Sequence, residues 1–273
     1  MIAIGPSGHA VDVAEAAPRV ALAPLRYSRL KLMAKSPAHC RFALDQDLAG
    51  VEDWDDTPSR RLGRLAHAVF LEQPLPVVFP GPRRAGKEWD AFKAANADRE
   101  IVKQEELETA LAMAAALRNH DEARELLRGG DIERTIFYEL AGRACRSTPD
   151  VHWNGKHLTD LKSTTDASPE RFPWQALKLG YHGQMAMQFD AILAVGMKMP
   201  ARIAIVAVEN RAPFVVNVFP LTPDAIEFGR RVYRSYFEQF LVCEQNNHWP
   251  GYAQGVLTAP PDSEGFGGDE LED

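Results

Sequence analysis

The stretch STPDVHWNGKHLTDLKST, residues 147–164, contains two short apolar runs that carry two aspartates and a lysine. At its centre Asn154-Gly155 is a strong signal for a two-residue type I′ hairpin, because both central positions of that turn need positive φ. The apolar runs on either side are therefore predicted to be adjacent antiparallel strands. Asp150 and Asp160 lie four and five residues from the turn, and we expect them to face one another across the sheet.

Outside this hairpin the chain changes character at about residue 131. Residues 27–130 are predicted to be mainly helical, including a helix over 56–73. The runs 132–140, 142–153 and 156–164 are predicted to form three antiparallel strands, followed by helix over 169–196, two further strands over 201–210 and 214–221, and a helix over 223–245. The prediction is an α+β fold with a core of about five mixed strands flanked by helices and an α-helical N-terminal half.

The length and charge of the chain outline its domain organisation. A chain of 273 residues with 45% hydrophobic residues can bury a large core, and we expect one domain over 27–252, with its α/β core in 131–245. Residues 1–26 are expected to be irregular because prolines interrupt them. Residues 253–273 are expected to be a disordered acidic tail, since the last twelve residues hold six acids and no base. The net charge of −7 falls to −7 + 6 = −1 without those acids, so the rest of the chain can still present a basic groove.

Several classes of protein are disfavoured by what the sequence lacks. No run approaches the roughly 18 apolar residues of a membrane span, and the first residues do not form a signal peptide, so we expect a cytoplasmic protein without a membrane partner. Three separated cysteines without a CxxC pair support neither a disulfide framework nor a cysteine metal site. The sequence also lacks the GxSxG, GxxxxGK[ST], HExxH and strand-linked GxGxxG motifs.

The acids and the lysine of the opening stretch suit metal-dependent phosphodiester cleavage. Two carboxylates can hold a hard divalent cation, and strand alternation places Asp160 and Lys162 on one face. The lysine would orient the attacking water or, as the neutral amine, deprotonate it, and as the ammonium it would neutralise charge on the phosphorus centre. A D-x-K pattern alone is equally an ordinary salt bridge on an exposed strand, and this alternative stays open.

His67 can be weighed from the helix that carries it. Apolar residues form a buried helical stripe at Leu62, Leu65, Ala66, Val69 and Phe70. At 100° per residue His67 falls about 130° from the centre of that stripe, with Gly63 one turn before it. We therefore expect His67 to lie outside the core, with the glycine leaving room for a metal or phosphate. A solvent-facing histidine is the alternative.

Four motifs, taken in order along the chain, together resemble the PD-(D/E)XK nuclease superfamily. They are GRLAHAVFLE (63–72), PD (149–150), DLKST (160–164) and YHGQMAMQFDA (181–191). Within it they are similar to the RecE-like, exonuclease VIII-type phage recombination exonucleases, over about residues 27–245. The resemblance implies that Mg²⁺, with Mn²⁺ as a substitute, is held by His67, Asp150, Asp160 and the carbonyl of Leu161. Lys162 would be the catalytic lysine.

The same resemblance assigns roles beside the strands. Glu133 corresponds to an acidic residue before the first core strand that assists a metal-bound water or a second ion. Gln184 resembles the glutamine of the family's Q-x-x-x-Y element, although Gln188 stands where tyrosine is expected. Tyr181, one turn before Gln184, is expected to take over the aromatic role.

Other positions are expected to contact DNA. Thr148 stands where the family often has an arginine ahead of PD, and Arg146 is expected to supply that phosphate contact. Arg60 and Arg64, in RRLGR, are expected to line a DNA path through phosphate contacts. The alternative for these arginines is an ordinary solvated helix face.

The resemblance implies a Mg²⁺-dependent DNA exonuclease that acts 5′→3′ on double-stranded ends and leaves a 3′ single strand for an annealing protein. It also implies a ring-shaped homo-oligomer, a tetramer in the RecE case. Two alternatives stay open: an endonuclease of the same superfamily, in restriction or repair, and a non-catalytic DNA-binding module. The joint presence of His67, Asp150, Asp160 and Lys162 disfavours the binding module.

Overall fold

The computed structural model describes residues 23–51, 57–71 and 76–252, without the side chains of residues 58–60. Its central sheet has five strands in the order β3-β6-β7-β8-β9. Their bounds are Asp131–Ile132 (β3), Val151–Trp153 (β6), His157–Thr164 (β7), Arg202–Glu209 (β8) and Val216–Pro220 (β9). β7 and β8 are parallel, whereas the other neighbours are antiparallel. The predicted mixed core of five strands is confirmed.

Two helices, α7 (Phe172–Lys178) and α8 (Tyr181–Ala194), make the crossover between the parallel strands β7 and β8. The single helix predicted over 169–196 is therefore divided. Gly180 divides it with a φ of +76°, and a Cβ at this position would lie 2.6 Å from the Tyr27 hydroxyl. Glycine is the residue that adopts this left-handed conformation without steric cost.

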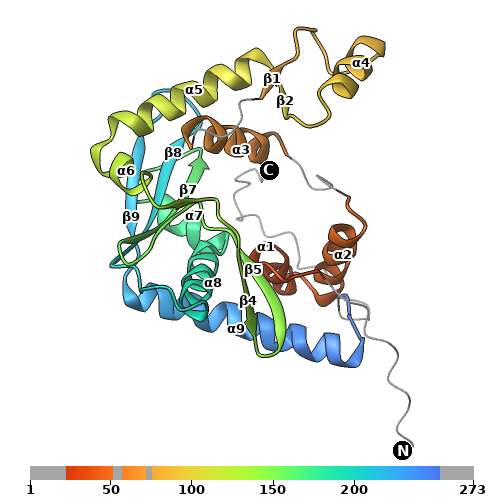
Figure 1. The fold of residues 1–273 in the computed structure, drawn as a ribbon, viewed down its shortest axis with the longest axis vertical. Helices are drawn as coiled ribbons and strands as arrows, with labels where there is room; N and C mark the ends of the chain where they lie inside the picture. The colour runs from red at the N-terminus through yellow and green to blue at the C-terminus, as the bar shows by residue number, and fades with distance from the viewer. Residues whose placement is uncertain (1–22, 52–56, 72–75, 253–273) are drawn as a thin grey trace, which may run out of the picture.

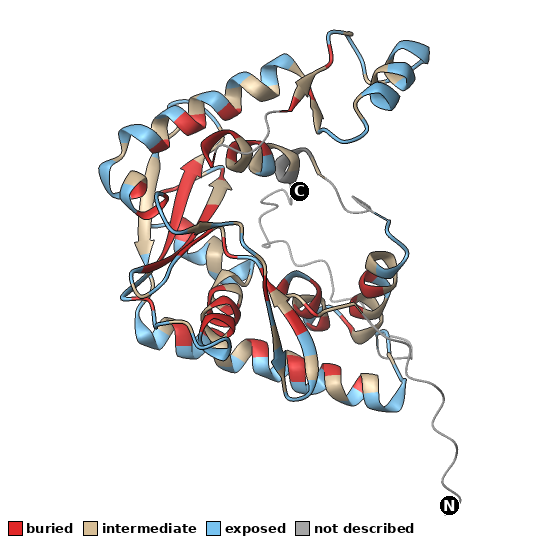
Figure 2. Cartoon of the chain, in the orientation of Figure 1, coloured by how far each residue is buried: buried red, intermediate tan, exposed pale blue. Residues whose placement is uncertain are grey.

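Helices cover both faces of the sheet (Figure 1). α8 and α9 (Pro223–Asn246) pack on one face, and α3 (Pro58–Phe70) and α5 (Gln104–Asn119) on the other. The predicted stripe of α3 is confirmed, since Leu65 and Val69 are buried against Leu161 and Val206. Full burial of each such side chain contributes about 1.5–3 kcal/mol. Figure 2 shows the buried residues concentrated in the sheet and on the inward sides of these helices.

The strands before β7 differ from the prediction. β4 (Ile136–Leu140) and β5 (Arg143–Ser147) form a separate two-stranded sheet, so the predicted three-stranded antiparallel unit is wrong. The run 142–153 is divided between β5 and β6 at Pro149, which lacks the N–H that a continuous ladder needs. The run 132–140 is interrupted at Glu133, whose φ of +46° is incompatible with a strand.

The hairpin of β6 and β7 forms as predicted, but with another turn. Trp153 pairs with His157, which leaves a loop of three residues, and the Lys156 N–H donates to the Trp153 carbonyl at 2.8 Å. Gly155 has a φ of +76°, whereas Asn154 is not among the described residues with positive φ, so the type I′ turn is wrong. The Asn154 side chain instead accepts from the Lys198 N–H at 2.7 Å.

The N-terminal half is mainly helical, as predicted. It contains α1 (Tyr27–Leu30), a 3-10 helix η1 (Lys31–Ala34), α2 (Pro37–Leu48), α4 (Lys87–Ala95), α6 (Asp121–Leu126) and two short parallel strands, β1 (Val77–Val78) and β2 (Ile101–Val102). Leu25, which was expected in an irregular segment, is fully buried and donates its N–H to the Ala144 carbonyl. The predicted acidic tail lies outside the described residues. Within the described ranges, no helix is long and apolar enough to cross a membrane.

Candidate active site

The side chains on the two faces of β7 point toward two different helices, α8 and α3. Asp160 and Lys162 point toward α8, where Lys162 Nζ lies 2.5 Å from Asp160 Oδ2. Leu161 and Ser163 point toward α3, because alternate residues of a strand face opposite sides. The predicted shared face of Asp160 and Lys162 is thus present, and Asp160 is only 1% exposed.

The first turns of α8 fix both of these side chains. Gln184 Nε2 donates to Asp160 Oδ1 at 2.8 Å, and Gln188 Nε2 approaches the same oxygen at 3.5 Å. The ring of Tyr181 lies 4.8 Å from Lys162 Nζ, a distance suited to a cation–π contact. Gln188, at the position where a tyrosine was expected, therefore contacts the carboxylate instead.

Asp150 lies at the start of β6, beside β7. Its Oδ2 accepts from the Leu161 N–H at 2.6 Å, and its carbonyl accepts from the Glu133 N–H at 3.0 Å. Glu133 follows β3 rather than preceding the first core strand, which corrects the prediction. Its left-handed backbone costs about 1–3 kcal/mol for a residue of this kind, and such residues cluster at functional sites.

His67 reaches the same point from α3. Its Nε2 lies 2.8 Å from the Leu161 carbonyl oxygen, and its Nδ1 lies 3.6 Å from Asp150 Oδ1 and 3.8 Å from Glu133 Oε1. A Cβ on Gly63 would lie 3.1 Å from Ser163 Oγ. The glycine lets α3 approach β7, and it also lines the cleft beside His67, where it was expected to leave room for a ligand.

Burial and neighbouring charges shift the pKa values of this cluster. Burial raises the pKa of Asp150 to about 6, with the Asp160 charge adding to the effect against the opposing charges of His67 and Lys162. Burial lowers the pKa of His67, but Asp150 and Glu133 outweigh it and raise that pKa to about 9. Burial likewise opposes the charged form of Lys162, yet Asp160 and Asp150 raise its pKa. The raised pKa values of His67 and Lys162 thus show that the carboxylates of the cluster stabilise positive charge beside them.

The donor atoms of His67, Glu133 and Asp150 lie within 4.8 Å of one another. Carboxylate oxygens suit hard divalent cations, and an imidazole nitrogen is a further ligand for a transition metal such as Mn²⁺. The set fits a metal ion, with the Leu161 carbonyl beside it. Asp160, the other predicted ligand, is not part of this group. Its Oδ1 accepts from Gln184, and its Oδ2 lies 2.5 Å from Lys162 Nζ.

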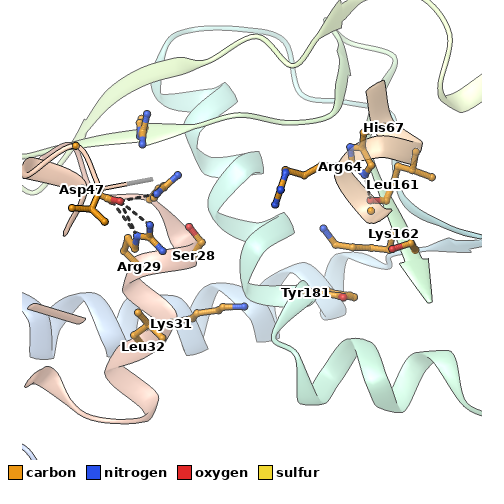
Figure 3. A pocket seen from close by; sticks show the side chains of 16 residues that line it. Ser28, Arg29, Lys31, Leu32, Asp47, Arg64, His67, Leu161, Lys162 and Tyr181 are labelled. Atoms are coloured by element: carbon orange, nitrogen blue, oxygen red, sulfur yellow. Dashed lines mark hydrogen bonds and ion pairs between the residues drawn. The ribbon is translucent and has the colours of Figure 1, made fainter. Parts of the chain in front are cut away.

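The cluster opens on a cleft of about 840 Å³ (Figure 3). α3 and β7 form one side of the cleft, and α1, η1 and the end of α2 form the other. The charged residues that line it are Arg26, Arg29, Lys31, Arg64, Arg146, Lys162 and Asp47, together with His67. The lining is thus strongly basic although the net charge of the chain is −7.

The residues predicted to contact DNA are distributed unevenly in this cleft. Arg146 and Tyr181 line it, and Arg64 lines it while lying 3.2 Å from Glu100. Arg60 is on α3, but its side chain lies outside the described part of the structure.

The cations of α1 and η1 were missed by sequence reasoning. Arg26, Arg29 and Lys31 line the cleft opposite His67 and Lys162. The spacing of Arg26 and Arg29, one helical turn, was a signal that they share a face. Their partner Asp47 follows 18 residues after Arg29, and that separation hides the cluster from the sequence.

Comparison with known proteins identifies the domain. Residues 27–257 match the model of a family described as a PDDEXK-like domain of unknown function (DUF3799). The chain belongs to this PDDEXK-like family. The predicted membership of the PD-(D/E)XK superfamily is confirmed. No curated protein matches the chain.

Solved structures share the fold of this PDDEXK-like domain. A candidate exonuclease from Eubacterium rectale is similar over 87% of this chain and 90% of its own, with a TM-score of 0.63 at 14% sequence identity. An alkaline exonuclease from Laribacter hongkongensis matches over 67% of this chain and 94% of its own at 14% identity, but its TM-score of 0.27 carries no argument. The first comparison shows a common fold.

Proposed function

We propose that the PDDEXK-like domain is a divalent-metal-dependent DNA exonuclease. The observation that carries the proposal is the convergence of His67, Glu133 and Asp150 beside the Asp160–Lys162 pair. His67 and Lys162 of this set also line the basic cleft. Ordinary surface ion pairs have no need of three further donors at the same point.

The residues of the cluster divide the chemistry between them. His67, Glu133 and Asp150 would hold the cation, with the Leu161 carbonyl beside them. Mg²⁺, for which Mn²⁺ is the expected substitute, polarises a phosphoryl oxygen and lowers the pKa of water when bound. Lys162 neutralises charge that develops on the phosphate and orients the attacking water.

Asp160 acts through its hydrogen bonds in this scheme. Its carboxylate holds the Lys162 ammonium at 2.5 Å, and Gln184 fixes the carboxylate in turn. The cation–π contact with Tyr181 restrains the ammonium from a second direction. Asp160 also remains a proposed metal ligand, because its charge acts directly on Asp150, which belongs to the donor group.

The cleft supplies the DNA-binding surface. Arg64 and Arg146 lie on its walls, and their guanidinium groups suit bidentate contacts with phosphates. Arg60, one turn before Arg64 on α3, extends this set in the proposal. Such contacts bind DNA irrespective of sequence and position the strand for cleavage.

The finer assignments rest on the motif resemblance. They are 5′→3′ action on double-stranded ends, a 3′ overhang that passes to a single-strand annealing protein, and a ring-shaped homo-oligomer. The candidate exonuclease from Eubacterium rectale has the same fold, and what it is named for agrees with the proposed exonuclease activity.

The proposal is tested with one DNA in three forms: linear duplex, nicked circle and closed circle, each with Mg²⁺ or EDTA. An exonuclease needs an end, so we expect linear DNA to be degraded while closed circles survive, and EDTA to stop the reaction. Cutting of closed circles would establish the endonuclease instead. Survival of every form at all divalent-metal conditions would reject the nuclease.

A further inference from the structure

A single carboxylate stands among the cations of the cleft. Asp47, at the end of α2, is the only acidic side chain among the described residues that line it. Arg29 donates to it through Nη2 at 2.7 Å and Nε at 3.0 Å, and Arg26 donates through Nη2 at 2.9 Å. Figure 3 shows this group across the cleft from His67 and Lys162.

The geometry of this group is that of a support for the two arginines. The side chains of Asp47 and Arg29 are each 11% exposed, whereas that of Arg26 is 35% exposed and lies nearer to solvent. An acid that serves only to reduce the charge of a cleft needs no such close contacts. A bidentate bond to Arg29 fixes the plane of the guanidinium as well as its position.

Without the carboxylate these cations would repel one another. Burial lowers the pKa of Arg26, and the positive charges of Arg29 and Arg146 lower it further, while Asp47 opposes the shift. Long side chains that are ordered before binding lose less conformational entropy when a ligand arrives. Asp47 therefore orders two cations that would otherwise separate.

We propose that Asp47 is a positioning residue that presents Arg26 and Arg29 in a fixed arrangement to the phosphates of bound DNA. This inference rests on the proposed function, because it takes DNA as the ligand of the cleft. It predicts an effect on DNA affinity opposite to the one expected from the change in net charge alone. Removing a negative charge from a basic cleft should tighten DNA binding, yet removing Asp47 should weaken it.

The test compares Asp47→Asn with a control on the same helix. Asp45 pairs with Arg41 at 2.8 Å, lies two residues from Asp47, has a side chain 44% exposed and does not line the cleft. Asp45→Asn changes the net charge by the same amount. Duplex DNA affinity is measured against salt with Ca²⁺ in place of Mg²⁺, and cleavage is measured with Mg²⁺.

We expect Asp47→Asn to weaken DNA binding about tenfold, the loss typical of a charge-assisted hydrogen bond. The plot of log affinity against log salt concentration should become shallower for this variant, because about one to two ordered phosphate contacts are lost. Each lost contact reduces the slope by roughly 0.9. KM should rise while kcat stays within about twofold, because the carboxylate does not touch the reacting atoms. Asp45→Asn should match the parent in each measurement.

Arg29→Lys provides a second variant that keeps all charges. Lysine lacks the planar fork, so the positioning role predicts weaker DNA binding for Arg29→Lys as well. If Asp47→Asn does not fold, the DNA affinity of Arg29→Lys tests the positioning role by itself. The melting temperatures of both variants are measured as well. A structural role alone would lower the melting temperature and leave KM and the salt slope of the folded protein unchanged.

Tighter DNA binding by Asp47→Asn with a steeper salt slope would overturn the inference. It would show that Asp47 only reduces the positive charge of the cleft. Parent-like binding by Asp47→Asn, or by Arg29→Lys if only that variant folds, would overturn it too. Failure of the proposed function is separately visible, because the parent would then not cleave DNA under any metal condition.

Discussion

The buried pair of Asp160 and Lys162 allows stability and catalysis to be separated. Lys162→Met keeps the length of the side chain but removes its charge, leaving Asp160, which is 1% exposed, without its cation and next to Asp150. Breaking a buried ion pair by removing one partner costs about 3–5 kcal/mol. The amides of Gln184 and Gln188 still donate to Asp160, so we expect about 3 kcal/mol, the lower end of that range.

The double variant Asp160→Asn/Lys162→Met removes both charges and should regain most of that stability. Both variants should nevertheless lose at least about a hundredfold in cleavage rate, because neither retains the charge that faces the phosphate. Urea unfolding in EDTA gives the stabilities, and single-turnover cleavage with Mg²⁺ gives the rates. Lys178→Met, on the exposed end of α7, is the matched control and should stay within about 0.5 kcal/mol of the parent.

Two results would refute this reasoning. A double variant no more stable than Lys162→Met would show that the lysine does not compensate a buried carboxylate. Cleavage by Lys162→Met within about twofold of the parent would show that its ammonium has no part in the chemistry, leaving the D-x-K pattern as an ordinary ion pair.

Three further predictions concern the supports of the site. Gly63→Val should push α3 away from β7 and lower both melting temperature and activity, and Gly63→Val/Ser163→Gly should restore part of each; no loss in the single variant would contradict the close approach. His67→Ala should raise the Mg²⁺ concentration for half-maximal rate, and it should lower the melting temperature in EDTA because it removes the cation beside Asp150; unchanged metal dependence would make His67 a packing residue. Burial opposes the ionised form of Asp47, but the bonds from Arg29 and the charge of Arg26 outweigh this and lower its pKa from the usual aspartate value. The stability advantage of the parent over Asp47→Asn should therefore be full at neutral pH, decline once the pH falls below the usual aspartate pKa and be lost as the pH falls through the lowered pKa of Asp47; an advantage independent of pH would contradict it.

The strands of the sheet and the pairing of Asp160 with Lys162 could be predicted from the sequence because both depend on local pattern. Strand alternation alone placed Asp160 and Lys162 on one face, and the β-branched run in residues 201–210 predicted β8. The helical stripe around Leu65 and Val69 predicted which side of α3 is buried. Each of these signals lies within one element, so no knowledge of tertiary packing is needed.

What the sequence did not predict depends on contacts between distant segments. The separation of β5 from β6 follows from a single proline, and the turn at Asn154 is set by a bond from the Lys198 backbone, 44 residues later. The carboxylate that holds Arg26 and Arg29 belongs to Asp47, near the end of α2. Propensity and periodicity contain no information about such pairs, whose spacing is fixed only when the elements pack.

The most direct test of the central claim is the release of acid-soluble nucleotides from uniformly labelled linear duplex DNA, with the parent compared with Asp150→Asn. Asp150 joins the donor group to β7 through the Leu161 N–H, and an asparagine keeps its shape while removing its charge. We expect release by the parent with Mg²⁺, none with EDTA and none by Asp150→Asn even at raised Mg²⁺. Release by Asp150→Asn equal to that of the parent, or continued release in EDTA, would contradict it.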